Sequence, residues 1–310
     1  MNTKKNTGNH QISHSQRDYF STTKERMRLR GVAPELPIST IPSLNTMVWG
    51  IKRREMTIIA GRTSHGKSAF MNQLAWDLAE KASVLYLSLE MDVPSLQERL
   101  FCNAMEVNNI ALIKGGYSTA PDIAKKWNEF EEILLSRRME YCDYIGKTWV
   151  QINSAMEALH HKPDVVIIDH INEIMSANVR DRRQVIDDYI IHMREMAIKE
   201  NFALVLGAQI NRMGQGESNR EPQLHQLKES GKIEESCDLA LLLYWPHKDN
   251  ENNPENIFKV NIGKNRNGWT GHLKIKYEPE FYRFSDLEKW EEKTYKEQRR
   301  KENKTEEWEE

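Results

Sequence analysis

The sequence predicts an α/β fold, in which a mostly parallel β-sheet is flanked by helices and ends in antiparallel strands. Short apolar segments of strand length alternate with longer segments of helical period, the pattern of parallel β-α-β units. A glycine-rich loop joins the first strand to the first helix. Near the C-terminus, two apolar segments flank Asn267-Gly268, a dipeptide typical of tight turns between antiparallel strands. Together these observations favour a sheet that is parallel first and antiparallel last.

The predicted elements follow this alternation along the chain. The expected strands are the short apolar runs at residues 56–60, 84–89, 164–169, 202–208, 239–244, 258–262 and 273–277. The expected helices are residues 67–81, 95–105, 123–138 and 183–200, and the last carries Ile186, Ile190, Met193 and Ala197 along one stripe. The run VVII at residues 165–168 is apolar at every position, so we expect helices to cover this strand on both faces.

The 310 residues are expected to form one large domain with two appendages. Residues 1–40 form a polar, basic lead-in, in which residues 18–30 have the composition of a linker helix. Residues 41–286 hold every predicted strand, a length that suits one core, since single cores rarely exceed about 250–300 residues. Residues 287–310 are rich in charges of mixed sign, which is typical of a solvated tail.

The composition excludes several classes of protein. No apolar run reaches the ~18 residues of a membrane span, and residues 1–16 lack the apolar core of a secretion signal. We therefore expect a cytoplasmic protein, which stays in the compartment where it is made and has no membrane partner. Cys102, Cys142 and Cys237 form no C-x-x-C pair, which argues against a disulfide framework and a zinc ribbon. The formal net charge of −2 means that any nucleic-acid binding depends on locally placed donors.

A phosphate-binding loop is the clearest motif. Residues 61–68 read GRTSHGKS, which fits G-x-x-x-x-G-K-[ST] and lies between a predicted strand and a predicted helix. The glycines let the backbone wrap closely, so that successive N–H groups and the helix N-terminus face the phosphates. Lys67 is expected to neutralise phosphate oxygens and Ser68 to bind Mg²⁺. The expected ATP-binding residues are Gly61, Arg62, Thr63, Ser64, His65, Gly66, Lys67, Ser68 and Ala69.

Three polar residues at the ends of later strands are expected to complete this site, because ligands gather at the carboxyl ends of parallel strands. Asp169 closes an apolar strand, where a carboxylate can hold Mg²⁺. Glu90 follows the strand after the phosphate-loop helix and is expected to polarise the attacking water. Gln209 ends a further strand and could sense the γ-phosphate. The alternatives are a turn-capping aspartate, a solvated glutamate and a hydrogen-bonded loop glutamine.

Several short motifs resemble those of the DnaB-type replicative helicases. SLEM at residues 88–91, IIDH at 167–170, AQINR at 208–212, LKESGKIEESCD at 227–238 and GKNRNG at 263–268 occur in that family's order, and YRF at 282–284 is similar to its last strand. The resemblance covers about residues 40–286. It implies a RecA-like ATPase/helicase domain over residues 41–286, in a phage-like variant that lacks the family's N-terminal domain. His170 also looks more like phage helicase-primases than the cellular enzymes.

The resemblance implies roles for individual residues. Lys67 and Ser68 correspond to the phosphate and Mg²⁺ ligands, Asp169 to the second metal ligand, Glu90 to the catalytic glutamate and Gln209 to the γ-phosphate sensor. Lys264 and Arg266 match a pair donated to the neighbouring subunit's ATP, with Arg266 as the arginine finger. The family's DNA loop falls on Lys228, Glu229, Ser230, Gly231 and Lys232.

Local sequence adds two expectations about these segments. We expect the Asn-Gly turn to hold Arg266 at an exposed tip, with Lys264 on the same face of its strand. Gly231 is expected to allow a phosphate close to the backbone. The alternatives are a basic hairpin tip that faces solvent or DNA, and a loop that merely leads into a helix.

The function implied by the resemblance is that of a ring-shaped, hexameric helicase. Such a protein hydrolyses ATP with Mg²⁺, moves 5′→3′ on single-stranded DNA and unwinds the duplex. The short N-terminus raises the prospect of a separate primase or loader protein as a partner. Two other functions stay open at this point: a RecA-like recombinase or loader, and an ATP-gated adaptor ATPase without unwinding activity. Stimulation of hydrolysis by single-stranded DNA, and unwinding of forked DNA, separate the three.

Overall fold

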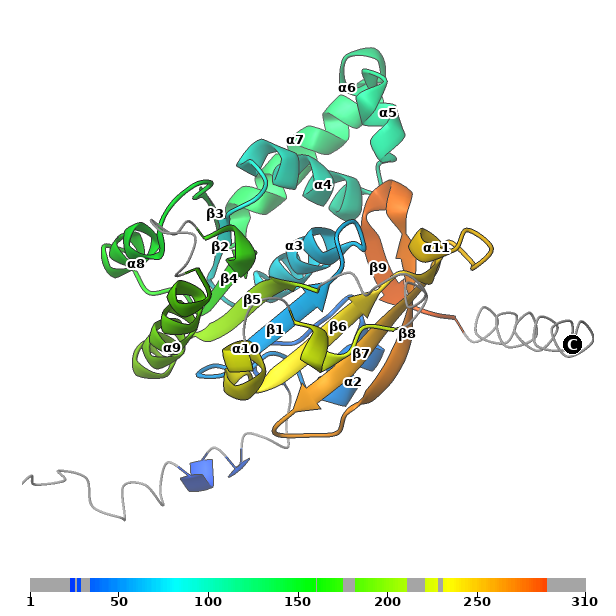
Figure 1. Cartoon of the computed structure of the whole chain (residues 1–310). Helices are drawn as coiled ribbons and strands as arrows, with labels where there is room; N and C mark the ends of the chain where they lie inside the picture. The colour runs from blue at the N-terminus through cyan, green and yellow to red at the C-terminus, as the bar shows by residue number, and fades with distance from the viewer. Residues whose placement is uncertain are drawn as a thin grey trace, which may run out of the picture. The chain divides into compact units, whose positions relative to one another are not determined.

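Figure 1 shows the computed structural model of the chain. The structure describes residues 23–25, 27–28, 34–159, 161–174, 182–210, 221–227 and 231–288. The chain divides into two units, Met1–Pro34 and Glu35–Glu310. In the first unit, residues 23–25 and 27–28 are helical and fall within the helix predicted at residues 18–30. The sheet, the helices and the site described below belong to the second unit.

The described part of the second unit is built on a nine-stranded sheet with the order β3-β2-β4-β5-β1-β6-β7-β8-β9. The strands are β1 (Met56–Gly61), β2 (Val84–Ser88), β3 (Met139–Asp143), β4 (Val165–Asp169), β5 (Ala203–Gln209), β6 (Leu239–Tyr244), β7 (Ile257–Asn265), β8 (Gly271–Glu278) and β9 (Arg283–Asp286). The strands from β3 to β6 are parallel, and β7, β8 and β9 continue the sheet antiparallel. This topology confirms the predicted RecA-like fold class.

The helices of the second unit cover both faces of the sheet (Figure 1). They are α2 (Pro42–Val48), α3 (Lys67–Leu78), α4 (Val93–Met105), α5 (Asn109–Ile113), α6 (Gly116–Thr119), α7 (Pro121–Ser136), α8 (Trp149–Glu157), α9 (Arg182–Glu200), α10 (Gly231–Ser236) and α11 (Pro246–Asp249), with 3₁₀ turns η1 (Ile171–Glu173), η3 (Leu224–Gln226) and η4 (Pro279–Phe281). The sequence predicted α3, α4, α7 and α9 but not the other helices. None of the described helices combines the length and apolar character that crossing a bilayer requires.

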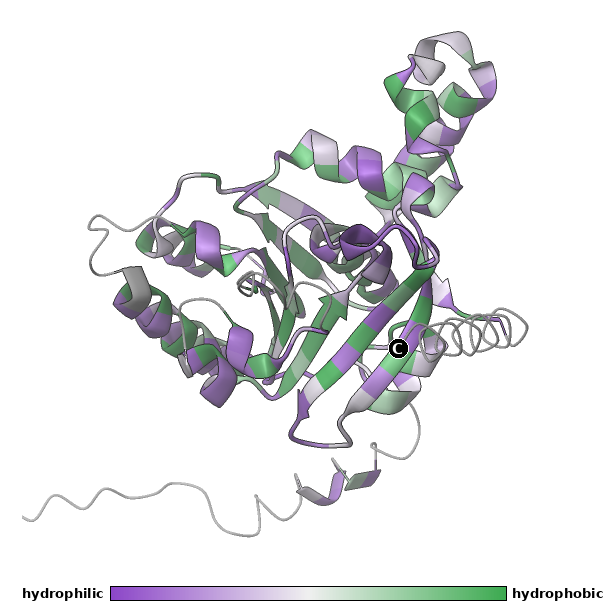
Figure 2. Ribbon diagram, turned by 45° about the vertical axis from the view of Figure 1, so that its right-hand side comes forward, coloured by the Kyte–Doolittle hydropathy of each residue, from purple (hydrophilic) through white to green (hydrophobic). Residues whose placement is uncertain are grey.

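Each central strand buries alternate side chains on opposite faces, as the pleat requires. On one face, Ile59, Tyr86, Ile167, Val205 and Leu241 pack with residues of α2 and α3. On the other, Ile58, Leu87, Ile168 and Leu206 pack with residues of α8, α9 and α10. Every residue of β4 is buried, which agrees with the strand covered on both faces that its apolar run predicts. In Figure 2 the central strands are mostly hydrophobic, while the long antiparallel strands and the helices show both hydrophobic and hydrophilic residues.

Asp77 ties helix α3 to the segment that precedes α2. Its Oδ2 accepts hydrogen bonds from the Thr40 backbone N at 3.1 Å and from Thr40 Oγ1 at 2.7 Å. Burial is the main cause that raises the pKa of Asp77 from the usual 3.8 to about 6, although the hydrogen bonds from Thr40 oppose it. The folded protein therefore takes up a proton at Asp77 at a pH where the unfolded chain does not.

This shift predicts a pH-dependent contribution to stability. Because the folded pKa lies above the unfolded one, the free energy of unfolding should rise as the pH falls from about 6 to about 4, by up to ~3 kcal/mol for a shift of about two units. Asp77→Asn removes the titrating group and should remove this increment. Urea denaturation of both proteins at about pH 7.5 and about pH 4.5 measures it. A difference in stability between the two proteins that is the same at both pH values would contradict the prediction.

Candidate active site

A cavity of about 480 Å³ opens around the carboxyl ends of the parallel strands. Its volume suits a ligand of nucleotide size. It is lined by Gly61, Arg62, Thr63, Ser64, Gly66, Lys67, Ser68, Ala69, Glu90, Met91, Arg99, His170, Glu173, Gln209, Tyr277 and Tyr282. The predicted phosphate loop and two of the predicted strand-end residues thus line one cavity.

The phosphate loop runs from the end of β1 at Gly61 to the start of α3 at Lys67. Gly66 caps the helix with a φ of 77°, a left-handed conformation that glycine adopts without strain. A Cβ at Gly66 would also lie 3.3 Å from Phe284 Cζ and 3.4 Å from Phe258 Cε2. Packing from the antiparallel strands therefore fixes the loop from behind, and the N-terminus of α3 faces the cavity.

Two side chains of the loop, those of Arg62 and His65, contact Asp249 of α11. His65 does not line the cavity: its Nδ1 accepts a hydrogen bond from the Trp245 backbone N at 3.2 Å, and its Nε2 lies 3.4 Å from Asp249 Oδ1. Burial lowers the pKa of His65 to about 4, so its ring is neutral at physiological pH. Arg62 lines the cavity, but its Nη1 lies 2.6 Å from Asp249 Oδ2. Because the His65 side chain does not line the cavity, the expected part of His65 in nucleotide binding stays a prediction for its backbone.

Lys67, which lines the cavity, contacts the buried Asp169, which does not line it. Lys67 Nζ lies 3.2 Å from Asp169 Oδ1, and Tyr86 Oη donates to Asp169 Oδ2 at 3.0 Å. Burial alone would raise the pKa of Asp169, yet the charge of Lys67 and a hydrogen bond from Ser68 leave that pKa below its usual value. An ionised carboxylate beside the Ser68 hydroxyl is a pair of hard oxygen donors, which fits the two protein ligands expected for Mg²⁺.

The described residues contain no group of three or more His, Cys, Asp or Glu side chains that could hold a metal ion.

Glu90 stands at the mouth of the same cavity, just after β2. Its Oε2 lies 3.3 Å from Nδ1 of His170, whose Nε2 lies 3.7 Å from Glu173 Oε1. The close contact with His170 is the main cause that lowers the pKa of Glu90, and the charge of Lys67 acts in the same direction. Glu90 is therefore ionised at neutral pH, as a base that accepts a proton from water must be.

Gln209 ends β5 beside the phosphate loop, since it pairs with Gly61 in the sheet. Its Nε2 donates to Thr63 Oγ1 at 2.7 Å, and its backbone N donates to Asn172 Oδ1 at 2.8 Å. The side chain thus bridges the end of β5 and the loop, at the place from which an amide could contact a terminal phosphate.

The far part of the cavity contains residues to which sequence reasoning gave no role. Met91, Arg99, Tyr277 and Tyr282 line it, and the Arg99 guanidinium carbon lies 5.2 Å from the centre of the Tyr282 ring. Arg99 comes from α4 and Tyr282 from the turn before β9, so only the fold brings them together. A planar cation beside an aromatic ring is a surface on which a nucleobase can stack.

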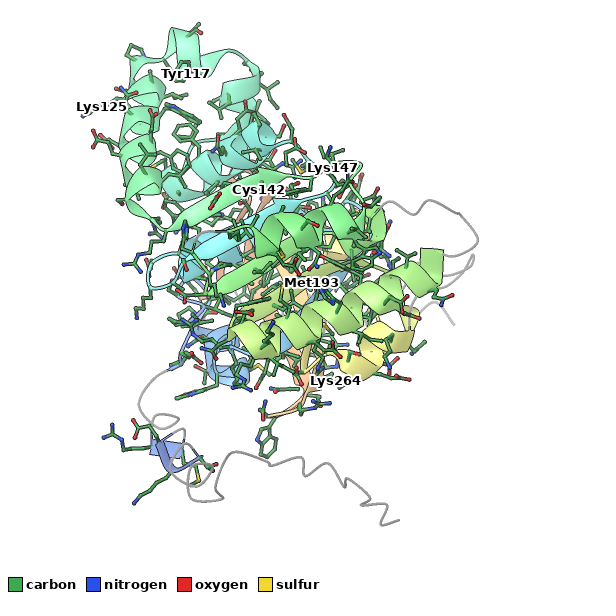
Figure 3. The ribbon with its side chains drawn as sticks, turned by 90° about the vertical axis from the view of Figure 1, so that its left-hand side faces the viewer. Tyr117, Lys125, Cys142, Lys147, Met193 and Lys264 are labelled. Atoms are coloured by element: carbon green, nitrogen blue, oxygen red, sulfur yellow. The ribbon has the colours of Figure 1, made fainter. Side chains whose placement is uncertain are left out.

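Lys264 and Arg266 lie near the amino ends of the parallel strands, whereas the phosphate loop lies at their carboxyl ends. Lys264 pairs with Ala240 near the start of β6, whereas the loop follows Gly61, which pairs with Leu243 near the end of β6. Figure 3 shows Lys264 on the β7–β8 hairpin, below α9 in that view. Since β6 rises by about 3.3 Å per residue, neither cation can reach the phosphate loop of its own chain.

A turn closes at the predicted place, within a longer hairpin connection. The Gly268 backbone N donates to the Asn265 carbonyl oxygen at 3.4 Å, so residues 265–268 form a tight turn that contains Asn267-Gly268. The last pair of β7 and β8 is Ile262 with Gly271, so the whole connection is longer than this turn. Asn265 organises it, because its Oδ1 accepts from Asn267 N at 3.2 Å and its Nδ2 donates to Trp269 O at 3.3 Å. The Arg266 side chain is 53% exposed, as expected at the tip, and its Nη1 lies 2.8 Å from Asp238 Oδ1.

The predicted DNA loop is only partly within the described structure. Lys228, Glu229 and Ser230 lie outside the described residues. Gly231 and Lys232 begin α10, where Lys232 Nζ lies 3.3 Å from Glu235 Oε2. A Cβ at Gly231 would have no atom within 4 Å, so the fold itself does not require glycine there.

The sequence is similar to those of known proteins. Residues 38–286 match the family model of the DnaB-like helicase C terminal domain. A probable replicative DNA helicase of Trieres chinensis is 27% identical over 87% of this chain and 62% of its own length. The replicative DNA helicase DnaB of Geobacillus stearothermophilus is 27% identical over 79% of this chain and 55% of its own length. The chain thus spans somewhat more than half of the length of these relatives.

Two solved structures have the same fold. One is an ATPase domain that superposes with a TM-score of 0.78 at 24% identity, covering 89% of this chain and 100% of that one. A structure of a DnaB-like replicative helicase and its interactions with primase gives a TM-score of 0.76 at 24% identity, covering 91% of this chain and 69% of that one. The family model covers most of the chain, including the phosphate loop, the strand-end residues and the hairpin. The chain therefore belongs to the family of DnaB-like helicase C-terminal domains.

Proposed function

We propose that this chain is the motor of a replicative DNA helicase, which hydrolyses ATP in the cavity described above and moves along single-stranded DNA. One observation supports the proposal above the others. Lys67, Asp169, Glu90 and Gln209 come together at one edge of the sheet, whereas Lys264 and Arg266 lie at the opposite edge. Lys264 and Arg266 therefore act on the cavity of a second copy of the chain, which supports a ring of identical subunits, a hexamer by family resemblance.

In this function each residue of the cavity has a separate part. Lys67 and the N–H groups of the phosphate loop bind the β- and γ-phosphates. Ser68 and Asp169 hold Mg²⁺, which neutralises charge on the phosphates when it is bound. Glu90 accepts the proton of the attacking water, and Gln209 contacts the γ-phosphate. Arg99 and Tyr282 hold the base of the nucleotide.

The proposal extends to the rest of the chain and to its partners. Residues 41–286 form the motor, residues 1–40 a linker segment, and residues 287–310 a charged tail. The loop at residues 228–232 contacts the backbone of single-stranded DNA, and movement is 5′→3′ by family resemblance. A primase or a loader protein is a further partner, in keeping with the solved relative that interacts with primase.

The test is the rate of ATP hydrolysis with and without single-stranded DNA, together with unwinding of a forked duplex. A helicase motor should be stimulated by the strand and should open the fork. Stimulation without unwinding would point to a recombinase or loader, and indifference to DNA would point to an adaptor ATPase. Mass measurements in solution with a non-hydrolysable nucleotide test the ring.

Substitution of the proposed DNA loop should separate DNA stimulation from hydrolysis. Lys228→Ala combined with Gly231→Ala is expected to abolish stimulation by DNA and to leave the basal rate unchanged. The reason is that lysine contacts with phosphates dominate sequence-independent binding, and a Cβ at Gly231 would intrude on a closely bound strand. Titration of a labelled oligonucleotide at increasing salt measures the binding.

A matched control is Lys125→Ala on α7, which removes an exposed lysine (Figure 3) far from the proposed loop. It should bind DNA as the wild type does. Equal DNA affinity in the double variant and the wild type would show that this loop is not the DNA site.

A further inference from the structure

The junction between α10 and β6 holds Lys264 and Arg266, the two cations proposed to act on the neighbouring subunit. Lys264 Nζ donates to the carbonyl oxygens of Glu234 at 2.6 Å and Glu235 at 3.2 Å, in the last turn of α10. Arg266 contacts Asp238, and Asp238 lies between the end of α10 and the start of β6. Cations suit this place because the carbonyl groups at the end of a helix carry partial negative charge.

Asp238 is the centre of this junction and is rigidly held. Only 4% of the residue is exposed. Its Oδ2 accepts from the Met56 backbone N at 3.0 Å, so the carboxylate is fixed to the start of β1 in the middle of the sheet. Its Oδ1 lies 3.2 Å from Arg194 Nη2 of α9 and 2.8 Å from Arg266 Nη1. One carboxylate oxygen thus faces two guanidinium groups, so Asp238 neutralises Arg266 only in part.

Asp238 holds Arg266 at both ends of the residue. The Arg266 backbone N donates to the Asp238 carbonyl oxygen at 2.8 Å, while the side chain is tied through Nη1. The Arg266 side chain is nevertheless 53% exposed. A guanidinium has five N–H donors in a rigid fork, so a contact through one nitrogen leaves others directed outward.

We propose that Asp238 is the positioning residue of the arginine finger, which it holds in the direction of the neighbouring subunit's cavity. This inference rests on the proposed action of Arg266 in trans. An exposed arginine otherwise samples many rotamers, and their loss would oppose each engagement with the neighbouring nucleotide. A buried carboxylate fixed to the sheet removes that freedom beforehand, and the partial balance of its charge by Arg194 leaves the finger positive.

A purely structural role for Asp238 makes a different prediction, and mixing of variants distinguishes the two. A subunit with Asp238→Asn should be a poor finger donor but a normal nucleotide binder. A subunit with Lys67→Ala is a normal donor with an inactive cavity. Mixed rings of these two should recover hydrolysis, because some interfaces join an intact cavity to an intact finger. Mixed rings of Asp238→Asn and Arg266→Ala should recover nothing, since both lack a working donor.

Steady-state kinetics provide the second measurement. Asp238→Asn alone should lower kcat by about 10–100-fold, the usual size of the effect when an orienting partner is lost, and change the KM for ATP by less than about threefold. Asp238→Glu keeps the charge but displaces it by one methylene. It should therefore behave as Asp238→Asn does in the mixing experiments. Arg194→Gln removes the other guanidinium group that contacts Asp238. Subunits with this variant should still restore hydrolysis when they are mixed with Arg266→Ala subunits.

The outcomes separate this inference from the proposed function. If Arg266→Ala and Lys67→Ala subunits fail to complement each other in rings that demonstrably form, the action of Arg266 in trans is wrong. If that pair recovers but Asp238→Asn and Asp238→Glu do not complement Lys67→Ala, the carboxylate is structural and the positioning role is overturned. If Asp238→Asn subunits recover hydrolysis when they are mixed with Arg266→Ala subunits, the positioning role is overturned. It is also overturned if both Asp238 variants hydrolyse ATP at the wild-type rate.

Discussion

Arg266→Ala is expected to lower the rate of ATP hydrolysis by about 10³–10⁵-fold, the range that an arginine finger supplies in phosphoryl transfer. The guanidinium would bridge γ-phosphate oxygens of the neighbouring subunit and stabilise charge that develops in the transition state. It cannot serve its own cavity, since the hairpin and the phosphate loop lie at opposite edges of the sheet. The measurement is kcat of the assembled protein, with the nucleotide affinity determined in parallel.

The conservative variant sharpens this prediction. Arg266→Lys keeps the charge but loses the planar fork, so it should recover only a small part of the lost rate. Nucleotide affinity should change much less than kcat in both variants, because each cavity keeps its own phosphate loop. A normal rate in Arg266→Ala would show that the hairpin is a basic surface without a part in hydrolysis.

Glu90→Gln is expected to lower kcat by about 10²–10⁴-fold while the protein still binds ATP. Glutamine has nearly the same shape as glutamate but cannot accept a proton from the attacking water. The close contact with His170 lowers the pKa of Glu90, so the wild-type carboxylate is ionised and ready to act as a base at neutral pH. Single-turnover hydrolysis and equilibrium nucleotide binding, measured on the same preparation, separate the two effects.

Glu173→Gln is the matched control for this substitution. Glu173 lines the same cavity and lies 3.7 Å from His170 Nε2, but it has no predicted part in the chemistry. Its variant should lose far less activity than Glu90→Gln. If the two variants lose the same amount, or if Glu90→Gln hydrolyses ATP at the wild-type rate, Glu90 is not the base.

The sequence by itself determined the elements that depend on local chemistry and on the spacing of apolar residues. The apolar run of β4 has only one stable environment, between two layers of helices, and that is where it lies. The phosphate loop follows from its glycine spacing, and Gly66 shows why, because its left-handed φ suits no other residue as well. Glu90, Asp169 and Gln209 were found from their positions, since parallel strands deliver their carboxyl ends to one edge.

Elements whose apolar residues show only weak periodicity could not be predicted from the sequence. Strand β3 reads MEYCD and lies at the edge of the sheet, where no residue of the strand is fully buried and the apolar pattern is lost. Helix α8 is short, and its stability comes from packing under the sheet through Ile152. Such elements are selected by their tertiary surroundings and leave little signal in their own residues.

Only the tertiary structure decided which distant side chains meet. The contact of Arg99 with Tyr282 joins α4 to the turn before β9, and that of His65 with Asp249 joins the phosphate loop to α11. Asp238 reaches Arg266 because β6 and β7 are neighbours in the sheet, a pairing that the tight turn predicted at Asn267-Gly268 does not by itself specify. Local sequence fixes backbone preference over a few residues, whereas ion pairs and stacked rings depend on the register and packing of segments far apart in the chain, which no short motif encodes.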